Sequence, residues 1–349
     1  MIDLNREIPR IQSALANHLF KQYGEKLEAM ELLHVVQRPY SVVAFLQLRI
    51  SNDVRRLVMK STVHHPINKD ITRRENQAVV EYNILRTIYP KFQEVQKCSV
   101  PRPVLVFPEI ETYLMEFVEG RSLGDELRYT RYLSSPRKFS VLREHFFHCG
   151  RWLKHFQEFT GVSPTGPEAL NGILERCDHR LRLIEKSSDP RCPKNLRAKV
   201  TRLLDKQLRE LSGREILVCG RHGDFGPWNI IANRDGISVL DFLGYQRDPV
   251  PVDLLKMVIH LEDEKKCYTS SAKRVDALRK SFLEGFGKLP SIPVQILIIC
   301  EAMHRTVSLA GNIFNLKQRF HNQFEANVRI RAHIEWLTNE GRKRVLWPS

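Results

Sequence analysis

The fold is decided by one stretch of sequence, Cys219-Gly-Arg-His-Gly-Asp-Phe-Gly-Pro-Trp-Asn-Ile-Ile-Ala-Asn-Arg-Asp-Gly-Ile-Ser-Val-Leu-Asp-Phe242. The pattern predicts a loop and then two short strands, because two apolar runs flank a turn-forming segment at residues 233–236. Asn229 comes just before the first strand and Asp241 just after the second, so a hairpin would bring them together. Amide and carboxylate oxygens are ligands for Mg²⁺, and Asp224, on the loop, can meet an incoming hydroxyl. The stretch therefore predicts a phosphoryl-transfer site.

The order His222-Gly-Asp224, then Asn229, then Asp241 within Val-Leu-Asp-Phe resembles the aminoglycoside phosphotransferase and choline kinase family, a protein-kinase-like phosphotransferase enzyme family. The resemblance implies an α+β, bilobal fold with a small lobe of antiparallel sheet plus one helix and a large, mainly helical lobe. It implies ATP and Mg²⁺ as cofactors, with Asp224 accepting or orienting the hydroxyl proton and with Asn229 and Asp241 holding the metal ion. His222 then supports the loop. The alternative is a surface hairpin whose acidic side chains are merely solvated.

Residues 1–117 are predicted to form the nucleotide-binding lobe, and residues 118–349 the helical lobe with the catalytic loop and acceptor site. A helical N-terminal extension precedes a meander of five strands, with one helix inserted after the third strand. That order is the order of a kinase-like small lobe. The predicted elements are a helix at residues 4–21, strands at 32–36, 42–50, 57–63, 104–107 and 112–117, and a helix at 72–88.

Two residues of this lobe match the family's phosphate-binding pair. Lys60 lies centrally on the third strand, where the family has a lysine that contacts the α and β phosphates. Glu81 lies on the inserted helix and would hold the Lys60 ammonium in an ion pair. Glu75 is also on this helix, but Glu81 is flanked by apolar residues and so can face inward. The alternative for Lys60 is an exposed strand lysine.

The contacts to the rest of the nucleotide are predicted less directly. Protein kinases place a glycine-rich loop between the first two strands, but residues 37–41 are Gln-Arg-Pro-Tyr-Ser and contain no glycine. Ser41 is therefore the candidate for contact with a phosphate oxygen, and Arg38 could add a charge. The segment Glu116, Phe117 and Val118 resembles the family's hinge, where backbone groups hydrogen-bond the adenine edge.

Helical periodicity predicts that the second lobe is mainly helical. Asp253, in Asp248-Pro-Val-Pro-Val-Asp253-Leu, resembles a family residue that backs the catalytic loop from the start of a helix, where a carboxylate is favoured. Arg221 is either solvated or a partner of a phosphate oxygen, and Trp228 packs either against the substrate or within the loop. The predicted helices are at residues 139–159, 168–185, 195–211, 252–261, 272–286, 294–309 and 324–337.

The charge of the chain is unevenly distributed. The net charge is +15, and residues 1–117 hold 16 Lys and Arg against 13 Asp and Glu, while the remainder holds 39 against 27. A basic second lobe favours anionic partners and disfavours a polycationic acceptor such as an aminoglycoside. The expected partner is a small-molecule acceptor, anionic or a sugar, with contact to a membrane surface or glycolipid as a further reading of the same charge. Nucleic-acid binding has only the charge in its favour, and a merely solvated basic surface explains the charge equally well.

The cysteines and the N-terminus indicate the compartment. Seven cysteines without a C-x-x-C pair favour a reducing environment over a disulfide framework. Residues 1–10 contain acidic residues and no apolar core of a signal peptide. The sequence therefore predicts a cytoplasmic protein, with a peripheral position at the inner face of the membrane as an extension of the charge argument.

Together these features predict an ATP- and Mg²⁺-dependent kinase that phosphorylates a hydroxyl of a saccharide or of a cell-surface glycan or lipopolysaccharide precursor. Three alternatives stay open at this point. The first is a choline- or ethanolamine-type kinase, and the second is an antibiotic kinase. The third is a kinase-fold binding protein without turnover, which the joint presence of Lys60, Asp224, Asn229 and Asp241 disfavours.

Overall fold

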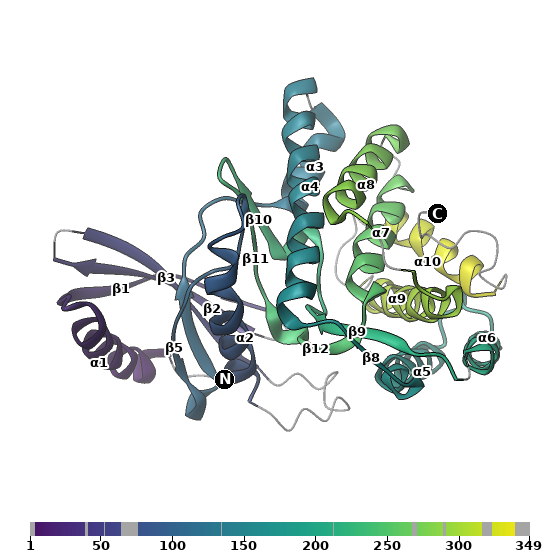
Figure 1. The fold of residues 1–349 in the computed structure, drawn as a ribbon, viewed down its shortest axis with the longest axis horizontal. Helices are drawn as coiled ribbons and strands as arrows, with labels where there is room; N and C mark the ends of the chain where they lie inside the picture. The colour runs from purple at the N-terminus through teal and green to yellow at the C-terminus, as the bar shows by residue number, and fades with distance from the viewer. Residues whose placement is uncertain are drawn as a thin grey trace. The chain divides into compact units, whose positions relative to one another are not determined.

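The computed structural model describes residues 4–38, 41–51, 53–63, 76–133, 135–211, 213–266, 271–288, 291–315 and 323–338. The chain divides into two compact units (Figure 1). The first unit is Met1–Gly120 with Ser238–Tyr245, and the second is Arg121–Ile237 with Gln246–Ser349. The fold is α+β, as predicted, with antiparallel strand pairing throughout the first unit's sheet.

The predicted helices all form, and their bounds shift by a few residues. Residues 72–75 of the predicted inserted helix, which include Glu75, lie outside the described residues. Helix α3 is additional to the prediction. The helices are α1 Leu4–Tyr23, α2 Gln77–Phe92, α3 Leu123–Leu133, α4 Pro136–Thr160, α5 Asn171–Ser187, α6 Leu196–Glu210, α7 Pro251–Lys265, α8 Ala272–Phe286, α9 Val294–Asn315 and α10 Gln323–Thr338.

Seven of the strands are short. Those at residues 230–233 and 236–239 are the two predicted around the turn, and periodicity hardly reveals the other five. The strands of the first unit's sheet are β1 Leu27–Gln37, β2 Ser41–Ile50, β3 Asp53–Thr62, β5 Pro103–Phe107 and β6 Thr112–Glu116. The others are β4 Cys98–Ser99, β7 Arg121–Ser122, β8 Ser163–Thr165, β9 Ile216–Arg221, β10 Ile230–Asn233, β11 Gly236–Val239 and β12 Gln246–Pro249.

The sheet of the first unit has the order β1-β2-β3-β6-β5. The meander prediction is therefore wrong at its end, because the fourth long strand lies at the edge and the fifth inserts beside β3. Pro103, the first residue of β5, has no N–H to donate, and such a residue suits the start of an edge strand. The long connection through α2 gives the chain the length to skip one position.

One face of this sheet is covered by α1 (Figure 1). Ile11, Leu15 and Leu19 recur every four residues, so they form a single stripe of the helix. They pack with Leu46 and Leu48, which are alternate residues of β2 and therefore share a face of the sheet. This packing leaves the opposite face of β2 and β3 for other groups, including Lys60.

The second unit is built around α9, which packs against α5, α6, α7 and α10. Helices α4 and α8 approach each other closely at two glycines. A Cβ added at Gly150 would lie 1.9 Å from the carbonyl oxygen of Phe282, and one added at Gly285 would lie 1.8 Å from that of Phe147. Both contacts are with backbone, so this helix pair has no room for a side chain at either position.

A small antiparallel sheet, β12-β9-β8, leads into the predicted catalytic loop. The stretch at residues 219–242 therefore begins inside a strand, since β9 runs to Arg221, and not in a loop as predicted. The loop itself spans residues 222–226 and ends in a short 3₁₀ turn, Pro227–Asn229. Strand β10 follows, pairing with β7, and then β11.

Candidate active site

Lys60 and Glu81 form a buried ion pair in the first unit. The Lys60 ammonium donates to Oε1 and Oε2 of Glu81 at 3.0 and 2.8 Å, and the Tyr113 hydroxyl donates to Oε2 at 3.1 Å. Both ion-pair partners lie below a tenth exposed. Burial raises the pKa of Glu81, and the Lys60 charge offsets part of that rise. Lys60 is thus not the exposed strand lysine of the alternative interpretation.

Asp241 is the second carboxylate on Lys60, and its Oδ1 accepts from Nζ at 2.7 Å. Burial lowers the pKa of Lys60, but the carboxylates of Asp241 and Glu81 more than offset this, so its pKa lies above the ordinary value. The backbone of Asp241 is left-handed, with φ of 70°. Asp and Asn adopt that conformation more readily than most other residues with a side chain. The backbone and the chemistry at this position therefore favour the same residue type.

The hinge segment is held by two backbone hydrogen bonds. The N–H of Glu116 donates to the carbonyl of Arg102 at 2.9 Å, and the N–H of Phe117 donates to that of Arg56 at 3.1 Å. Two of the three N–H groups considered for adenine are therefore already used within the protein. The Val118 N–H is the donor that these bonds leave for a ligand.

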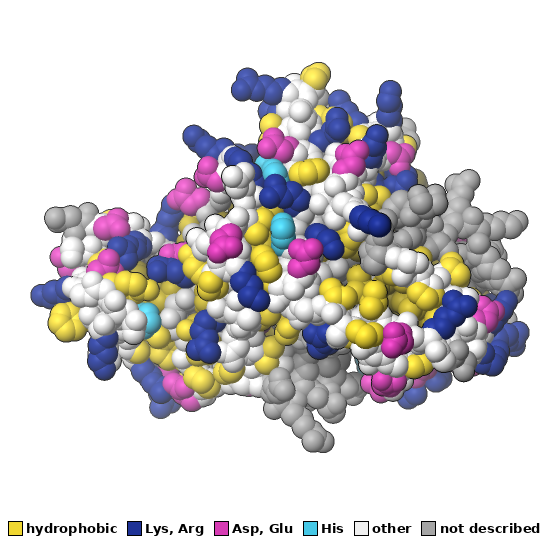
Figure 2. All heavy atoms as spheres, viewed as in Figure 1, with side chains coloured by type: hydrophobic (Ala, Val, Ile, Leu, Met, Phe, Trp, Pro, Cys, Tyr) yellow, Lys and Arg dark blue, Asp and Glu magenta, His cyan; other side chains and the backbone are white. Residues whose placement is uncertain are grey.

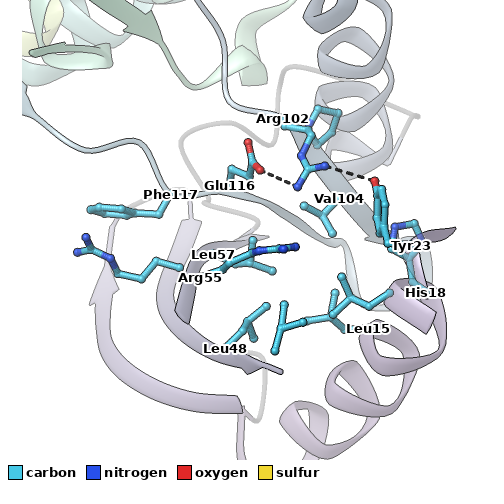
Figure 3. Close-up of a pocket in the computed structure, with 14 residues that line it drawn as sticks. Leu15, His18, Tyr23, Leu48, Arg55, Leu57, Arg102, Val104, Glu116 and Phe117 are labelled. Carbon is cyan, nitrogen blue, oxygen red and sulfur yellow. Dashed lines mark hydrogen bonds and ion pairs between the residues drawn. The ribbon is translucent and has the colours of Figure 1, made fainter. Parts of the chain in front are cut away.

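The Glu116 side chain lies on the sheet face opposite Lys60. Glu116 is paired in register with Leu57, and Leu57 is three residues from Lys60, so their side chains point to opposite faces. The Glu116 carboxylate pairs with Arg102 at 2.6 Å, and Arg102 also reaches the Tyr23 hydroxyl at 3.3 Å (Figure 3). Contact of this segment with a nucleotide on the Lys60 face therefore falls to its backbone.

A cavity of about 220 Å³ lies on that second face, between α1 and the sheet (Figure 3). Its floor is apolar, with Leu15 and Leu48 among the lining residues, and Arg55, Arg102 and Glu116 lie at its polar side. The cavity belongs wholly to the first unit and does not contain Lys60.

Ser41, the candidate for phosphate contact, is the first residue of β2 and is buried. Its carbonyl accepts from the N–H of Arg38 at 2.8 Å, closing the hairpin between β1 and β2. Pro39 and Tyr40, between them, lie outside the described residues. Phosphate contact through Ser41 stays a prediction.

In the second unit, Asp253 anchors the catalytic loop from the first turn of α7. Its carboxylate accepts the backbone N–H of His222 at 2.6 Å and that of Gly223 at 3.1 Å. Burial raises the pKa of Asp253, and the neighbouring His222 and Arg221 side chains with the two N–H bonds offset part of the rise. The buried His222 ring accepts the Asp224 N–H at 3.3 Å and packs edge-on against Trp152. These contacts fix the backbone that carries Asp224.

Asp224 receives three side-chain donors. Trp228 Nε1 donates to Oδ2 at 2.9 Å, Asn229 Nδ2 donates to Oδ2 at 2.8 Å, and the Lys256 ammonium donates to Oδ1. The Trp228 ring is held over Gly226, where an added Cβ would lie 2.5 Å from Cζ2. Trp228 therefore hydrogen-bonds the Asp224 carboxylate directly and does more than pack within the loop, one of the two roles considered for it from the sequence.

Lys256 is the contact of Asp224 that the sequence alone did not reveal. It lies on α7 three residues after Asp253, which places both on one face of the helix. Its ammonium also lies 5.7 Å from the centre of the Trp228 ring. The signal that could have found it is this spacing, because a helix whose first turn anchors a loop presents its second turn to the same loop.

Three arginines near the loop have structural partners. The buried Arg221 pairs with Asp248 on the neighbouring strand β12 at 2.6 Å, so it is not the solvated arginine considered above. Arg176 pairs with the same carboxylate at 2.8 Å. Arg247 donates to the carbonyls of Thr160 and Gly161 at 3.0 and 3.1 Å, which ties β12 to the end of α4.

The two predicted metal ligands belong to different units, Asn229 to the second and Asp241 to the first. The Asn229 amide nitrogen donates to the Asp224 backbone carbonyl at 3.0 Å and to Oδ2 of the same residue. The amide oxygen of Asn229 is then the atom that can bind a hard metal ion such as Mg²⁺. Among the described residues no cluster of three or more His, Cys, Asp and Glu could hold a metal ion. Mg²⁺ is commonly bound by one or two protein oxygens together with substrate phosphates, and the oxygen donors here fit that mode. Their joint binding of one ion stays a prediction.

The sequence model of the Phosphotransferase enzyme family matches residues 69–290, more than half of the chain. The chain belongs to this family. The matched segment contains Glu81, Asp224, Asn229 and Asp241, whereas Lys60 lies before it. The protein is therefore a phosphotransferase with a hydroxyl group as acceptor, as the sequence predicted.

Solved structures share its fold. A thermostable mutant of aminoglycoside phosphotransferase APH(4)-Ia, in complex with AMP-PNP and hygromycin B, has a TM-score of 0.53 at 11% identity and covers 95% of this chain and 100% of its own. Choline kinase LicA from Streptococcus pneumoniae has a TM-score of 0.53 at 13% identity, covering 95% and 99%. A choline/ethanolamine kinase family protein from Mesorhizobium loti has a TM-score of 0.52 at 14% identity, covering 96% and 95%. At these identities the likeness shows the fold, which is protein-kinase-like.

No curated protein sequence matches the phosphotransferase with statistical significance. Among its described helices, none combines the length and the apolar character that crossing a bilayer requires.

Proposed function

We propose that this phosphotransferase transfers the γ-phosphoryl group of ATP, with Mg²⁺, to a hydroxyl of a saccharide or glycan precursor that carries negative charge. The observation that carries the proposal is the Asp224 carboxylate. It is oriented by Trp228 and Asn229 and still 45% exposed, so an acceptor hydroxyl can reach it. In loose phosphoryl transfer the positioning of the hydroxyl matters more than strong basicity.

The nucleotide part of the proposal rests on the first unit. Lys60, held by Glu81, would contact the α and β phosphates, and the Val118 N–H with the Glu116 carbonyl would bind the adenine edge. A fold relative bound to AMP-PNP supports the choice of an adenine nucleotide. Mg²⁺ would be held by Asn229 and Asp241, where it neutralises phosphate charge and orients the γ-phosphoryl group.

The acceptor part rests on charge. Helix α7, which carries Lys256 to the site, has three consecutive acids in its last turns, and each already has a cation. Glu262 pairs with Arg279 at 3.1 Å, Asp263 with Lys266 at 3.6 Å, and Glu264 with Arg329 at 3.0 Å. A cationic acceptor such as choline or an aminoglycoside would therefore find these carboxylates neutralised.

The visible surface does not add a single basic patch to this argument. Figure 2 shows Lys and Arg side chains dispersed among acidic ones. Arg197 on α6, one of the basic residues of the second part of the chain, pairs with Asp178 at 3.0 Å and Glu185 at 3.4 Å. Contact with an anionic membrane surface from the cytoplasmic side stays part of the proposal, and sedimentation with phosphatidylserine vesicles at rising salt would test it.

The test is an acceptor screen for ADP release with MgATP. Anionic sugars, neutral sugars, choline, ethanolamine and aminoglycosides are compared for the wild type and for Asp224→Asn, which keeps the shape of the side chain. We expect turnover with an anionic sugar and a loss of about 10²-fold or more in the variant, whose ATP affinity stays unchanged. Faster turnover with choline or an aminoglycoside would overturn the acceptor class, and equal turnover in the variant would overturn the role of Asp224.

A further inference from the structure

We propose that Lys256 is a catalytic residue, whose ammonium binds the transferred phosphoryl group next to the acceptor hydroxyl at Asp224. This inference rests on the proposed function. It adds to the predicted site a positively charged residue that is not among the motif residues of the sequence analysis. It concerns the second unit alone, where all the contacts used below are found.

The placement of Lys256 is fixed by the same helix that fixes the loop. Asp253 binds two backbone N–H groups of the loop, and Lys256 follows it by three residues on α7. The Lys256 side chain is only 19% exposed, whereas lysine side chains are mostly exposed unless they are paired. Its ammonium is held between the Asp224 carboxylate and the face of the Trp228 ring.

Stabilisation of the fold does not explain this placement. Asp224 is nearly half exposed, and an ion pair with so exposed a partner contributes about 0–1 kcal/mol. The carboxylate is already oriented through Oδ2 by two neutral donors, Trp228 and Asn229. Lys256 instead binds Oδ1, the oxygen that these donors leave for the acceptor hydroxyl.

The chemistry at Oδ1 brings the phosphoryl group to Lys256. A hydroxyl that gives its proton to Asp224 lies about 2.6–3.2 Å from the carboxylate oxygen. The phosphorus atom it attacks lies about 3–3.5 Å from the hydroxyl oxygen in a reactive geometry. An ammonium in contact with the same carboxylate oxygen is then within reach of an equatorial phosphoryl oxygen, and its three protons can serve both partners.

In the step itself, the bond from the acceptor oxygen to the γ-phosphorus forms and the bond from that phosphorus to the bridging oxygen breaks. The hydroxyl proton passes to Asp224, and ADP leaves with the electron pair of the broken bond. Lys256 stays protonated and stabilises the charge on the equatorial oxygens, which is where the transition state carries it.

The competing interpretation is that Lys256 binds a negative group of the acceptor and takes no part in transfer. A probe without any acceptor separates the two. MgADP with aluminium fluoride forms a planar mimic of the transferred phosphoryl group with water in place of the hydroxyl. The readout is the dissociation constant of a fluorescent ADP analogue with and without fluoride.

Three variants are compared with the wild type. Lys256→Met removes the charge and keeps most of the length, and Lys256→Arg keeps the charge. The matched control is Lys265→Met on the same helix, whose lysine pairs with Glu262 at 2.9 Å away from the loop. Thermal unfolding by circular dichroism establishes that each variant is folded.

We expect fluoride to tighten ADP binding in the wild type and in Lys265→Met, and the tightening to fall about 10²-fold in Lys256→Met. Affinity for ADP alone should stay within about twofold, and Lys256→Arg should keep part of the tightening. Equal tightening in Lys256→Met, or none in the wild type, would overturn the inference. A wild type that does not bind MgADP would instead overturn the proposed function, and the inference with it.

Discussion

Replacing the buried pair of Lys60 and Glu81 tests whether the first unit is organised around it. Lys60→Met leaves Glu81 buried beside Asp241, and Glu81→Leu leaves Lys60 with Asp241 as its remaining carboxylate in this cluster. Removal of one partner of a buried ion pair costs about 3–5 kcal/mol. We expect Glu81→Leu at the low end, because the 2.7 Å contact between Lys60 and Asp241 persists.

The double variant Lys60→Met/Glu81→Leu should cost far less than the two single costs added together. Replacement of a whole buried pair by apolar side chains is often neutral, so the main loss is the acceptor of the Tyr113 hydroxyl, about 1–3 kcal/mol. The coupling free energy between the two sites should then be about 3–7 kcal/mol. Tyr113→Phe, which removes only the 3.1 Å hydroxyl bond to Glu81, is the control.

The assay uses the distribution of tryptophan. The three tryptophans that the structure describes all lie in the second unit, so their fluorescence reports on that unit, while far-UV circular dichroism reports on both. In urea, the single variants should show a circular dichroism transition that begins well before the fluorescence transition. Coincident and unshifted transitions in Lys60→Met, or single-variant costs that simply add in the double variant, would refute the reasoning.

Three further predictions concern the second unit. Burial lowers the pKa of His304 to about 3. Below the ordinary histidine pKa of 6.5, the unfolded chain therefore binds a proton at His304 and the folded chain does not. This difference should lower the free energy of unfolding by about 2 kcal/mol from pH 7 to pH 5. Urea unfolding at both pH values measures it, and an equal loss in His304→Gln would contradict it. Gly150→Ala should destabilise by about 3 kcal/mol or more, because its Cβ meets backbone, whereas Gly311→Ala on α9 meets nothing within 4 Å and should be neutral or stabilising; similar midpoints would count against the close approach of α4 and α8. Trp228→Phe should lower the rate of ADP release about tenfold by removing a donor to Asp224, and an unchanged rate would remove that role.

The sequence predicted the local elements well wherever side-chain periodicity was strong. Helix α1 and strand β2 form where expected because one face of each is buried against the other. Glu81 was preferred for its apolar neighbours, and it is fully buried beside Lys60. The position of β5 was not predictable from periodicity, because edge and interior strands of a sheet can carry the same alternation.

The long-range contacts of the site were the part that the sequence could not supply. Asp241 was expected as a metal ligand, and its contact with Lys60 joins residues 181 positions apart. Lys256 looks like an ordinary solvated lysine on an amphipathic helix, and only the fold reveals what it contacts. Arg221 could not be assigned because its partner, Asp248, lies on a strand of four residues that shows no periodicity.

The cavity beside Glu116 has a consequence for chemical selectivity. One wall of the cavity comes from α1 and includes Leu15 and Tyr23. Helix α1 lies outside residues 69–290, the segment that the family model matches. The opposite wall includes Arg102 and Glu116, which lie within it. A compound shaped to both walls would contact the hinge from the side away from Lys60, and most of the residues that line the cavity lie in sequence that the family pattern does not constrain. Such a compound would discriminate between this enzyme and its relatives where a nucleotide analogue would not.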